Sequence, residues 1–188
     1  MIGFFGGSFD PVHYGHLKMA SAVKEELGLS QLFLMPCKTP VHKKELQFSN
    51  QQRLEMLNLA VLEFNDLQVD TREMNRQSAS YTIDTLKEIK ADYPNESIFL
   101  LIGADSFKAL NTWKNYRQFS DYAQLVVLPR VTNERQKMDV NVIFSNTPLV
   151  NISSTQIRGI LKGDLKGKIN ENLNGLVPKK LINYLRDL

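Results

Sequence analysis

The sequence predicts an α/β protein with a doubly wound parallel sheet, and three observations point to that class. Apolar runs of four or five residues show no alternation with polar residues, which is typical of strands buried on both faces. Amphipathic segments of helical length separate these runs, as helical crossovers between parallel strands do. The 188 residues contain no repeat, low-complexity tract or long linker, so we expect a single domain spanning residues 1–188.

The first strand and helix are predicted at the N-terminus. Residues 2–5 form an apolar run that ends at a pair of glycines, and residues 15–28 follow with helical periodicity. One face of that helix carries His16 together with apolar side chains, and Gly28 is placed to cap its C-terminus. Residues 32–35, just before a proline, are predicted to form the second strand.

The second helix is predicted by its start signal, the capping box Ser49-x-x-Gln52. An apolar stripe should bury one face of this helix. The stripe consists of Leu54, Leu57 and Val61. Residues 67–70 then form a candidate short strand.

The second half of the chain continues the alternation and closes with a short helical segment. We expect, in order, a helix over 81–89, strands over 98–102, 125–128 and 141–144, a helix after residues 153–155, and a final helix opened by Pro178.

Composition and charge exclude several classes of protein. No apolar run approaches the ~20 residues that cross a bilayer, and no basic residue precedes Lys18, so we expect a cytoplasmic protein rather than a secreted or membrane one. The single cysteine, Cys37, excludes an internal disulfide and a cysteine-based zinc cluster. Residues 151–188 carry seven Lys or Arg against three acids. This excess fits nucleic acid, an anionic small ligand or plain solvation about equally, because aromatic residues are few there.

The glycines and histidines near the N-terminus are the strongest candidate site. His13 and His16 straddle the start of the first helix, where unpaired N–H groups and the helix dipole favour an anion. A lone histidine is more often structural. Here, however, all three histidines (His13, His16 and His42) lie in the first 42 residues, two of them beside a glycine loop, and that clustering favours a functional role.

Several motifs resemble a known family. GGSFDPVHYGH resembles the signature of the nucleotidyltransferase superfamily, and ISSTQIR at 152–158 resembles its second signature. The PVHK, SYT, IGADS and TWKNY segments are similar to those of bacterial nicotinate mononucleotide adenylyltransferases. Ser8, Val41 and Ala79 depart from that pattern without removing a functional group. The resemblance implies a Rossmann-like sheet and transfer of AMP from ATP to nicotinate mononucleotide, giving deamido-NAD and pyrophosphate.

The resemblance also implies which residues hold ATP. His16 would contact the α-phosphate, His13 would hold the phosphates nearby, and Arg158 would grip the β- and γ-phosphates. Capping of a helix by residues 153–155 and a solvated Arg158 are the simpler structural explanations. The implied ATP site consists of Gly6, Gly7, Ser8, Phe9, His13, Gly15, His16, His42, Lys43, Gly103, Asp105, Ser153, Ser154, Thr155 and Arg158.

For the mononucleotide, the resemblance implies that Trp113 stacks on the pyridine ring and that backbone N–H groups near Thr82 and Lys114 receive the carboxylate. Core packing of Trp113 and capping of a turn by Asp105 are the structural alternatives. The implied mononucleotide site consists of Ser80, Tyr81, Thr82, Asp105, Trp113 and Lys114. Mg²⁺ is expected to arrive with ATP, without a metal site in the protein.

Two other functions stay open on the sequence alone. A related adenylyltransferase acting on phosphopantetheine or nicotinamide mononucleotide fits the superfamily signatures, although the SYT, TWKNY and PVHK segments argue against it. A non-catalytic nucleotide- or nucleic-acid-binding protein would use the basic C-terminal segment. We expect ATP and nicotinate mononucleotide as partners, no nucleic acid and no membrane, with the oligomeric state, a homo-oligomer included, left open.

Overall fold

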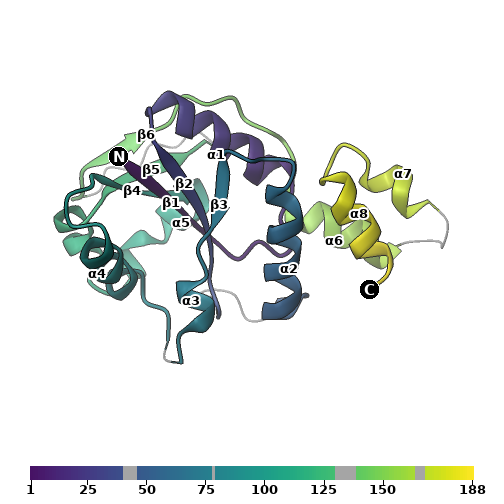
Figure 1. The fold of residues 1–188 in the computed structure, drawn as a ribbon, viewed down its shortest axis with the longest axis horizontal. Coiled ribbons are helices and arrows are strands. Elements are labelled where there is room, and N and C mark those ends of the chain that lie inside the picture. The colour runs from purple at the N-terminus through teal and green to yellow at the C-terminus, as the bar shows by residue number, and fades with distance from the viewer. Residues whose placement is uncertain (40–45, 78, 130–138, 164–167) are drawn as a thin grey trace.

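In a computed structural model, the chain is described over residues 1–39, 46–77, 79–129, 139–163 and 168–188 (Figure 1). Within these ranges, parallel strands form one six-stranded sheet in the order β3-β2-β1-β4-β5-β6. The strands are β1 (Ile2–Gly7), β2 (Gln31–Pro36), β3 (Leu67–Val69), β4 (Ile98–Gly103), β5 (Gln124–Leu128) and β6 (Val142–Phe144). This is the doubly wound parallel sheet that the sequence predicts.

The strand order reverses direction between β1 and β4. β1 pairs with β2 on one side and with β4 on the other, so consecutive crossovers leave the sheet in opposite directions from this point. Crevices at the carboxyl ends of such neighbouring strands are the usual ligand sites of open α/β sheets. Gly6 and Gly7 end β1, and Gly103 ends β4, at this edge.

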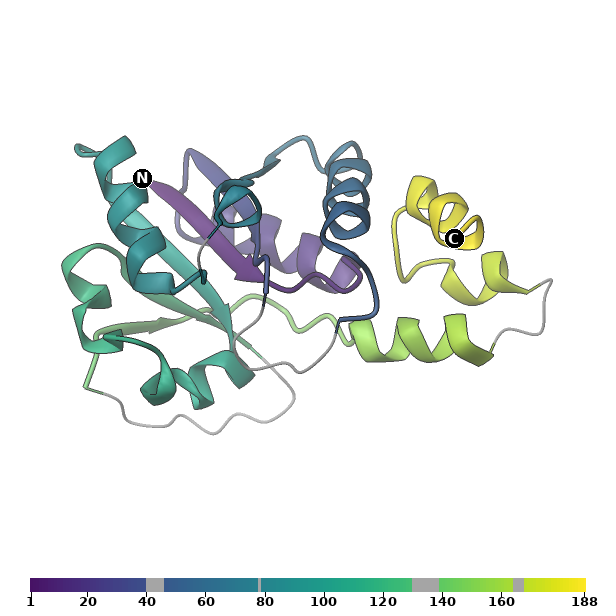
Figure 2. The same cartoon turned by 90° about the horizontal axis from the view of Figure 1, so that it is seen from below.

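Helices cover both faces of the sheet (Figures 1 and 2). Alternate side chains of β1 point to opposite faces, so Phe5 joins the core beneath α1 and α2, whereas Ile2 and Phe4 join the core beneath α4 and α5. The helices are α1 (Tyr14–Glu26), α2 (Asn50–Val61), α3 (Arg72–Asn75), α4 (Thr82–Asp92), α5 (Ala104–Lys108), α6 (Ser154–Gly163), α7 (Ile169–Leu173) and α8 (Lys179–Arg186), with 3₁₀ turns at Leu110–Thr112 and Tyr116–Asp121.

Local start and stop signals are confirmed where they were strongest. Ser49 caps α2 through its side chain, and the Gln52 side chain accepts from the Ser49 backbone N–H in return. Gly28 has a φ of +62° after α1, and the N–H groups of Gly28 and Leu29 bond back to Glu25 and Lys24. This pair of hydrogen bonds is the Schellman motif, in which glycine is the favoured residue.

The buried stripe of α2 differs from the prediction. Leu54 and Val61 are only partly buried, whereas Arg53 and Met56 join Leu57 in the interior. The apolar pattern was correct for Leu57 and for Val61, which packs against the core, but it carried no signal that an arginine would lie there as well. The helices α3, α5 and α7 were also not predicted, since each is too short to show a periodic stripe.

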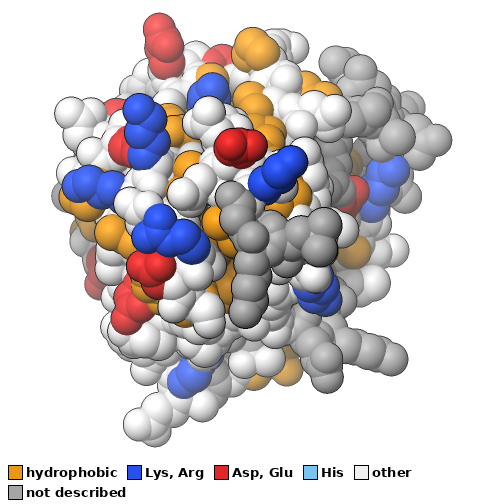
Figure 3. Space-filling view, turned by 90° about the vertical axis from the view of Figure 1, so that its right-hand side faces the viewer, with side chains coloured by type: hydrophobic (Ala, Val, Ile, Leu, Met, Phe, Trp, Pro, Cys, Tyr) orange, Lys and Arg blue, Asp and Glu red, His pale blue; other side chains and the backbone are white. Residues whose placement is uncertain are grey.

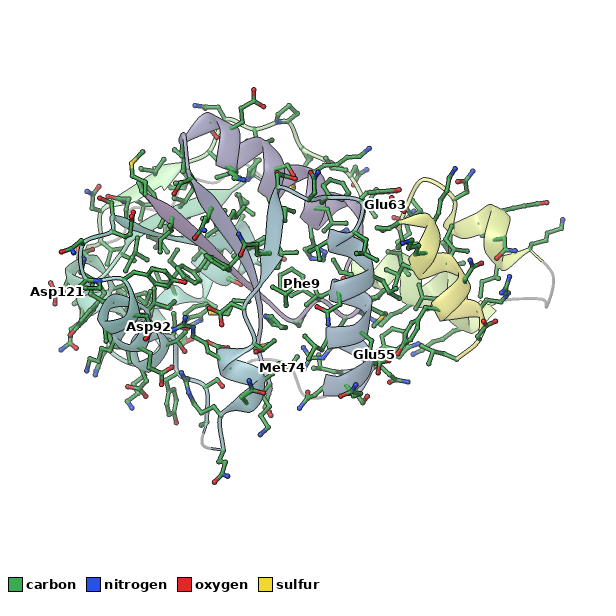
Figure 4. All side chains as sticks on the ribbon, in the orientation of Figure 1. Phe9, Glu55, Glu63, Met74, Asp92 and Asp121 are labelled. Atoms are coloured by element: carbon green, nitrogen blue, oxygen red, sulfur yellow. The ribbon has the colours of Figure 1, made fainter. Side chains whose placement is uncertain are left out.

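The C-terminal helices pack against α2, which they reach from the far end of the chain. Glu55 on α2 and Glu63 just after it point toward them (Figure 4), and these carboxylates accept hydrogen bonds from the Tyr184 hydroxyl at 2.5 Å and the Lys179 N–H at 2.9 Å. Leu181 and Leu185 belong to the same apolar core as α1 and α2. Among the described residues, no helix combines the length and the apolar character needed to cross a membrane.

Candidate active site

The loop after β1 is built around a buried aromatic side chain. Phe9 is 1% exposed and has a φ of +45°, and its ring lies edge-on to the rings of Phe5 and His16, with centroids 5.6 and 5.1 Å away. A Cβ added to Gly7 would come within 3.0 Å of the Phe9 ring. Gly7 therefore leaves room for this ring, which lies between the sheet and α2 in Figure 4.

The two histidines of the motif lie against each other at the start of α1. Their ring centroids are 3.7 Å apart with an interplanar angle of 31°, and His13 is buried whereas His16 is partly exposed. A Cβ on Gly15 would lie 2.8 Å from two atoms of the His13 ring and 3.1 Å from the Ile152 carbonyl oxygen. Gly15 thus has a packing role that needs no ligand, because it lets the His13 ring close on the backbone.

Arg158 brings the second motif to the first. Its guanidinium donates a 2.6 Å hydrogen bond to the Asp10 carbonyl oxygen and lies 3.7 Å from the Asp10 carboxylate. A second nitrogen donates to the Thr155 hydroxyl at 3.0 Å. Arg158 is therefore not a freely solvated surface charge. Arg158 and Asp10 are 148 residues apart in the sequence, so their contact joins the N-terminal motif to the C-terminal one.

The two serines before Arg158, Ser153 and Ser154, make different hydrogen bonds. The Ser153 hydroxyl accepts from the Gln156 N–H at 3.1 Å, which is the capping bond of α6. The Ser154 hydroxyl instead donates to the Pro11 carbonyl oxygen at 3.0 Å. One serine thus satisfies the helix, and the other fixes the helix to the loop after β1.

Asp10 was not among the candidate residues, although it stands inside the motif. It is 3% exposed, and its carboxylate accepts from the backbone N–H groups of Gln47 and Phe48 at 3.0 and 2.9 Å. It therefore joins the loop after β1, the start of α2 and Arg158. An acid between two apolar residues in a motif was the available signal, and its partners lie too far along the chain for spacing to reveal them.

The N-terminus of α4 forms the second part of the candidate site. Tyr81 occupies the N-cap position of α4, and no side chain caps the helix there. The Lys114 ammonium lies 4.4 Å from the centroid of the exposed Tyr81 ring and 3.3 Å from the Asp84 carboxylate. These contacts bring Thr82 and Lys114, which are far apart in sequence, to one place.

Trp113 retains both explanations that the sequence allowed. Its ring packs on the core in a T-shaped contact with Phe119, at a centroid distance of 6.2 Å, yet the residue stays partly exposed.

The remaining candidate residues lie just before α4 and after β4. The Ser80 hydroxyl, just before α4, donates to the Glu73 carbonyl oxygen at 3.4 Å. At the end of β4, no atom lies within 4 Å of a Cβ built on Gly103, and Asp105 is exposed in the first turn of α5.

His42 and Lys43 lie outside the described residues. Within the described residues, no group of three or more His, Cys, Asp or Glu side chains is arranged to hold a metal ion. Two surface hollows, of about 630 and 340 Å³, lie near the opposite edge of the sheet, beside Gly28 and beside Ser97. We assign the site from side-chain chemistry, because neither hollow contains a motif residue.

Comparisons with known proteins show the family to which the chain belongs. The cytidylyltransferase-like family model matches residues 4–160. A probable nicotinate-nucleotide adenylyltransferase from Vesicomyosocius okutanii is 45% identical, over 100% of this chain and 95% of its own length. One from Psychromonas ingrahamii is 35% identical, over 99% and 94%.

The fold also matches solved structures. The nicotinic acid mononucleotide adenylyltransferase of Plasmodium falciparum, complexed with NaAD, superposes with a TM-score of 0.77 at 18% identity, over 99% of this chain and 94% of that one. A putative nicotinate-nucleotide adenylyltransferase from Vibrio parahaemolyticus gives a TM-score of 0.69 at 19% identity, over 98% and 97%. The chain therefore belongs to the cytidylyltransferase-like family and, within it, to the nicotinate-nucleotide adenylyltransferases.

Proposed function

We propose that this chain transfers AMP from ATP to nicotinate mononucleotide, releasing pyrophosphate and forming deamido-NAD. One observation carries the assignment of the site: the 2.6 Å bond from Arg158 to the Asp10 carbonyl oxygen, which joins two motifs from opposite ends of the chain beside the histidine pair. The site lies at the carboxyl edge of the sheet, beside the reversal of strand order, where nucleotides bind in such folds.

The reaction needs positioning and charge stabilisation more than proton transfer. The mononucleotide phosphate is already largely ionised at neutral pH, since its second pKa is about 6, so it attacks the α-phosphorus without an activating base. His16, partly exposed at the first turn of α1, is the group we assign to the α-phosphate and its growing charge. His13 packs against the His16 ring and holds it in place, and we assign it to the neighbouring phosphates as well.

Arg158 is assigned to the leaving pyrophosphate. Its guanidinium has a planar set of donors suited to phosphate oxygens. Its contacts with Asp10 and Thr155 hold it beside the loop after β1. The N-terminus of α6 adds backbone N–H groups and the positive end of a helix dipole.

The mononucleotide is assigned to the region where α4 begins. Tyr81 leaves the first N–H groups of α4 without a side-chain cap, and these groups suit a carboxylate. Such a site favours nicotinate over nicotinamide, because an amide would direct N–H donors at N–H donors. Trp113, partly exposed, offers its ring face to the pyridine.

Mg²⁺ fits this site as an ion bound to ATP. The described residues provide no group of three potential ligands, so an ion that arrives with the nucleotide would take most of its ligands from phosphate oxygens and water. When bound, Mg²⁺ supplies charge neutralisation of the triphosphate. Asp105, exposed in the first turn of α5 just after β4, is the carboxylate assigned to the ribose hydroxyls or to a water of that ion.

The test measures pyrophosphate release from ATP and Mg²⁺ with either nicotinate or nicotinamide mononucleotide. We expect turnover with nicotinate mononucleotide and a clear preference for it. Absence of turnover with both would contradict the proposed function, and equal turnover would contradict only the carboxylate site.

A nucleic-acid-binding protein is the competing function, and it predicts salt-dependent binding of oligonucleotides that survives loss of His16. Figure 3 views the molecule from the side of the C-terminal helices, where Lys and Arg side chains are scattered among acidic and apolar ones. Among the described residues of this face, Lys and Arg form no continuous stripe in Figure 3, which supports the enzyme over nucleic-acid binding.

A further inference from the structure

Arg53 is a fully buried cation for which the reaction described above has no use. It lies in the second turn of α2 with 0% exposure, and it is among the largest side chains buried completely in the described part of the chain. A buried guanidinium costs free energy unless its donors are satisfied. The hydrogen bonds of the Arg53 guanidinium therefore show which segments it joins in return for its burial.

The guanidinium joins the loops that follow β1 and β2. One terminal nitrogen donates to the Ser8 carbonyl oxygen at 2.6 Å. The other donates to the carbonyl oxygens of Cys37 and Lys38 at 2.8 and 3.1 Å, and to the Asn50 side chain at 2.6 Å. Two neighbouring strand ends and the start of α2 are thus held by one planar group.

The four acceptors of these hydrogen bonds are neutral oxygens, and Asp10 and Cys37 also attract the guanidinium. Burial lowers the pKa of the Arg53 guanidinium, against the opposing effects of Cys37 and Asp10. An arginine pKa is so high in water that the group stays charged at neutral pH. A charged group can hold several carbonyl oxygens at once, because charge-assisted hydrogen bonds are shorter and stronger than neutral ones.

The Ser8 carbonyl is next to the residues that shape the histidine pair. Ser8 lies between Gly7, whose space the Phe9 ring occupies, and Phe9 itself, whose ring contacts His16 at a centroid distance of 5.1 Å. On the other side, Cys37 donates its backbone N–H to the Gly7 carbonyl oxygen at 3.0 Å. A shift of the Ser8 carbonyl would therefore move Phe9 and, through it, His16.

We propose that Arg53 is a positioning residue for the ATP side of the reaction: it fixes the loop after β1 against the segment after β2, and so sets the place of His16. The inference rests on the proposed function for its substrate. It assigns no contact between Arg53 and ATP, since the side chain is buried and acts through Ser8 and Cys37.

The experiment compares Arg53→Lys with the unmodified protein. Lysine keeps the charge, but one ammonium cannot hold both the Ser8 and the Cys37 carbonyl oxygens in the geometry of a planar fork. We expect the Kd for ATP with Mg²⁺, measured by calorimetry without mononucleotide, to rise at least ~10-fold, the scale of a small misplacement of catalytic groups. The KM for ATP should rise in parallel, and the KM for nicotinate mononucleotide should change less than about 2-fold.

Leu57→Ala is the matched control, because Leu57 is fully buried one turn later in the same helix and contacts no motif loop through a polar group. It should lower the melting temperature while leaving the ATP Kd unchanged. Two results would overturn the inference: native ATP affinity in Arg53→Lys, or an equal loss of ATP affinity in Leu57→Ala at equal loss of thermal stability.

Asn50→Ala provides a second variant that spares the buried charge. Asn50 is exposed, so the protein should stay folded, but the guanidinium loses its 2.6 Å acceptor. We expect a rise of about 2- to 5-fold in the ATP Kd, as for loss of one charge-assisted hydrogen bond that acts indirectly. An unchanged Kd contradicts the inference even if Arg53→Lys does not fold. Because binding is measured without turnover, a protein that binds ATP but releases no pyrophosphate would refute the proposed function and not this inference.

Discussion

The two halves of the candidate site are held by different kinds of contact. The phosphate side, residues 6–16 and 153–158, is joined by hydrogen bonds that span 143 and 148 residues, from Ser154 to Pro11 and from Arg158 to Asp10. The pyridine side, residues 80–84 and 113–114, is joined by the Lys114–Asp84 pair, whose side chains are 46% and 42% exposed.

This difference indicates where the site is rigid before ligands arrive. Partly buried hydrogen bonds to backbone carbonyls keep their geometry, and catalysis by fixed dipoles requires such preorganisation. An exposed ion pair contributes little and rearranges easily. We therefore expect a preformed phosphate side and a pyridine side that adjusts around its ligand.

The largest effect should come from the phosphate side. His16→Ala removes the group assigned to the α-phosphate, and we expect kcat to fall by about 10²-fold or more, as for loss of an electrostatic stabiliser. Steady-state kinetics with both substrates measure it, and thermal unfolding shows whether the fold survives. An unchanged kcat would refute the role of His16.

A smaller effect, confined to one substrate, is expected from the pyridine side. Trp113→Ala removes the ring face that we assign to the pyridine, so the KM for nicotinate mononucleotide should rise about 10-fold while the KM for ATP stays the same, on the scale of one aromatic contact. If both KM values stay unchanged, Trp113 serves only the core through its contact with Phe119.

The network beneath the pyridine side should respond to pH. Burial raises the pKa of Glu73, and hydrogen bonding by Thr85 and attraction by Arg76 only partly oppose this rise. Because the folded pKa lies above the unfolded one, the stabilisation is complete below the unfolded pKa and is lost as pH rises through the folded pKa. Glu73→Gln should remove that loss and make the protein more stable than the unmodified chain at neutral pH.

Denaturant unfolding between mildly acidic and neutral pH measures this effect. The gap between Glu73→Gln and the unmodified protein should close as the pH is lowered. A gap of the same size at every pH would show that the charge of Glu73 is not its cause.

The smallest effect is expected from the exposed pair. Asp84→Asn removes the partner of Lys114, and stability should change by less than about 1 kcal/mol, as for other surface ion pairs. The change should shrink further at high salt. A loss several times larger, measured by the same unfolding titration, would show that the pyridine side is as rigid as the phosphate side.

The elements that the sequence predicted best are those with local causes. Apolar runs gave the six strands, and the Ser49 capping box and Gly28 placed helix ends correctly, because each signal acts within one strand or one helical turn. The predicted stripe of α2 was incomplete for the opposite reason. Arg53 enters the interior only because carbonyl groups from two distant loops receive it.

The site shows the same division. The structure brings residues of the two motifs together, and His13 and His16 flank the start of α1, as a glycine loop before a helix predicts. Asp10 escaped notice, since its partners are the backbone of residues 47–48 and the side chain of Arg158. Spacing along the chain carries no information about such pairs.

By itself, the sequence determined the class of fold, the succession of strands and longer helices along the chain, and the family, because periodicity, caps and motifs are local patterns. Only the tertiary structure decided which residues meet. β1 and β2 are paired neighbours, so the loops that follow them lie together around Arg53, and α6 returns to the loop after β1 and brings Arg158 to Asp10. The physical reason is that a buried polar group is stable only when its partners are supplied, and these partners come from other loops for Arg53 and, through Arg158, from the far end of the chain for Asp10.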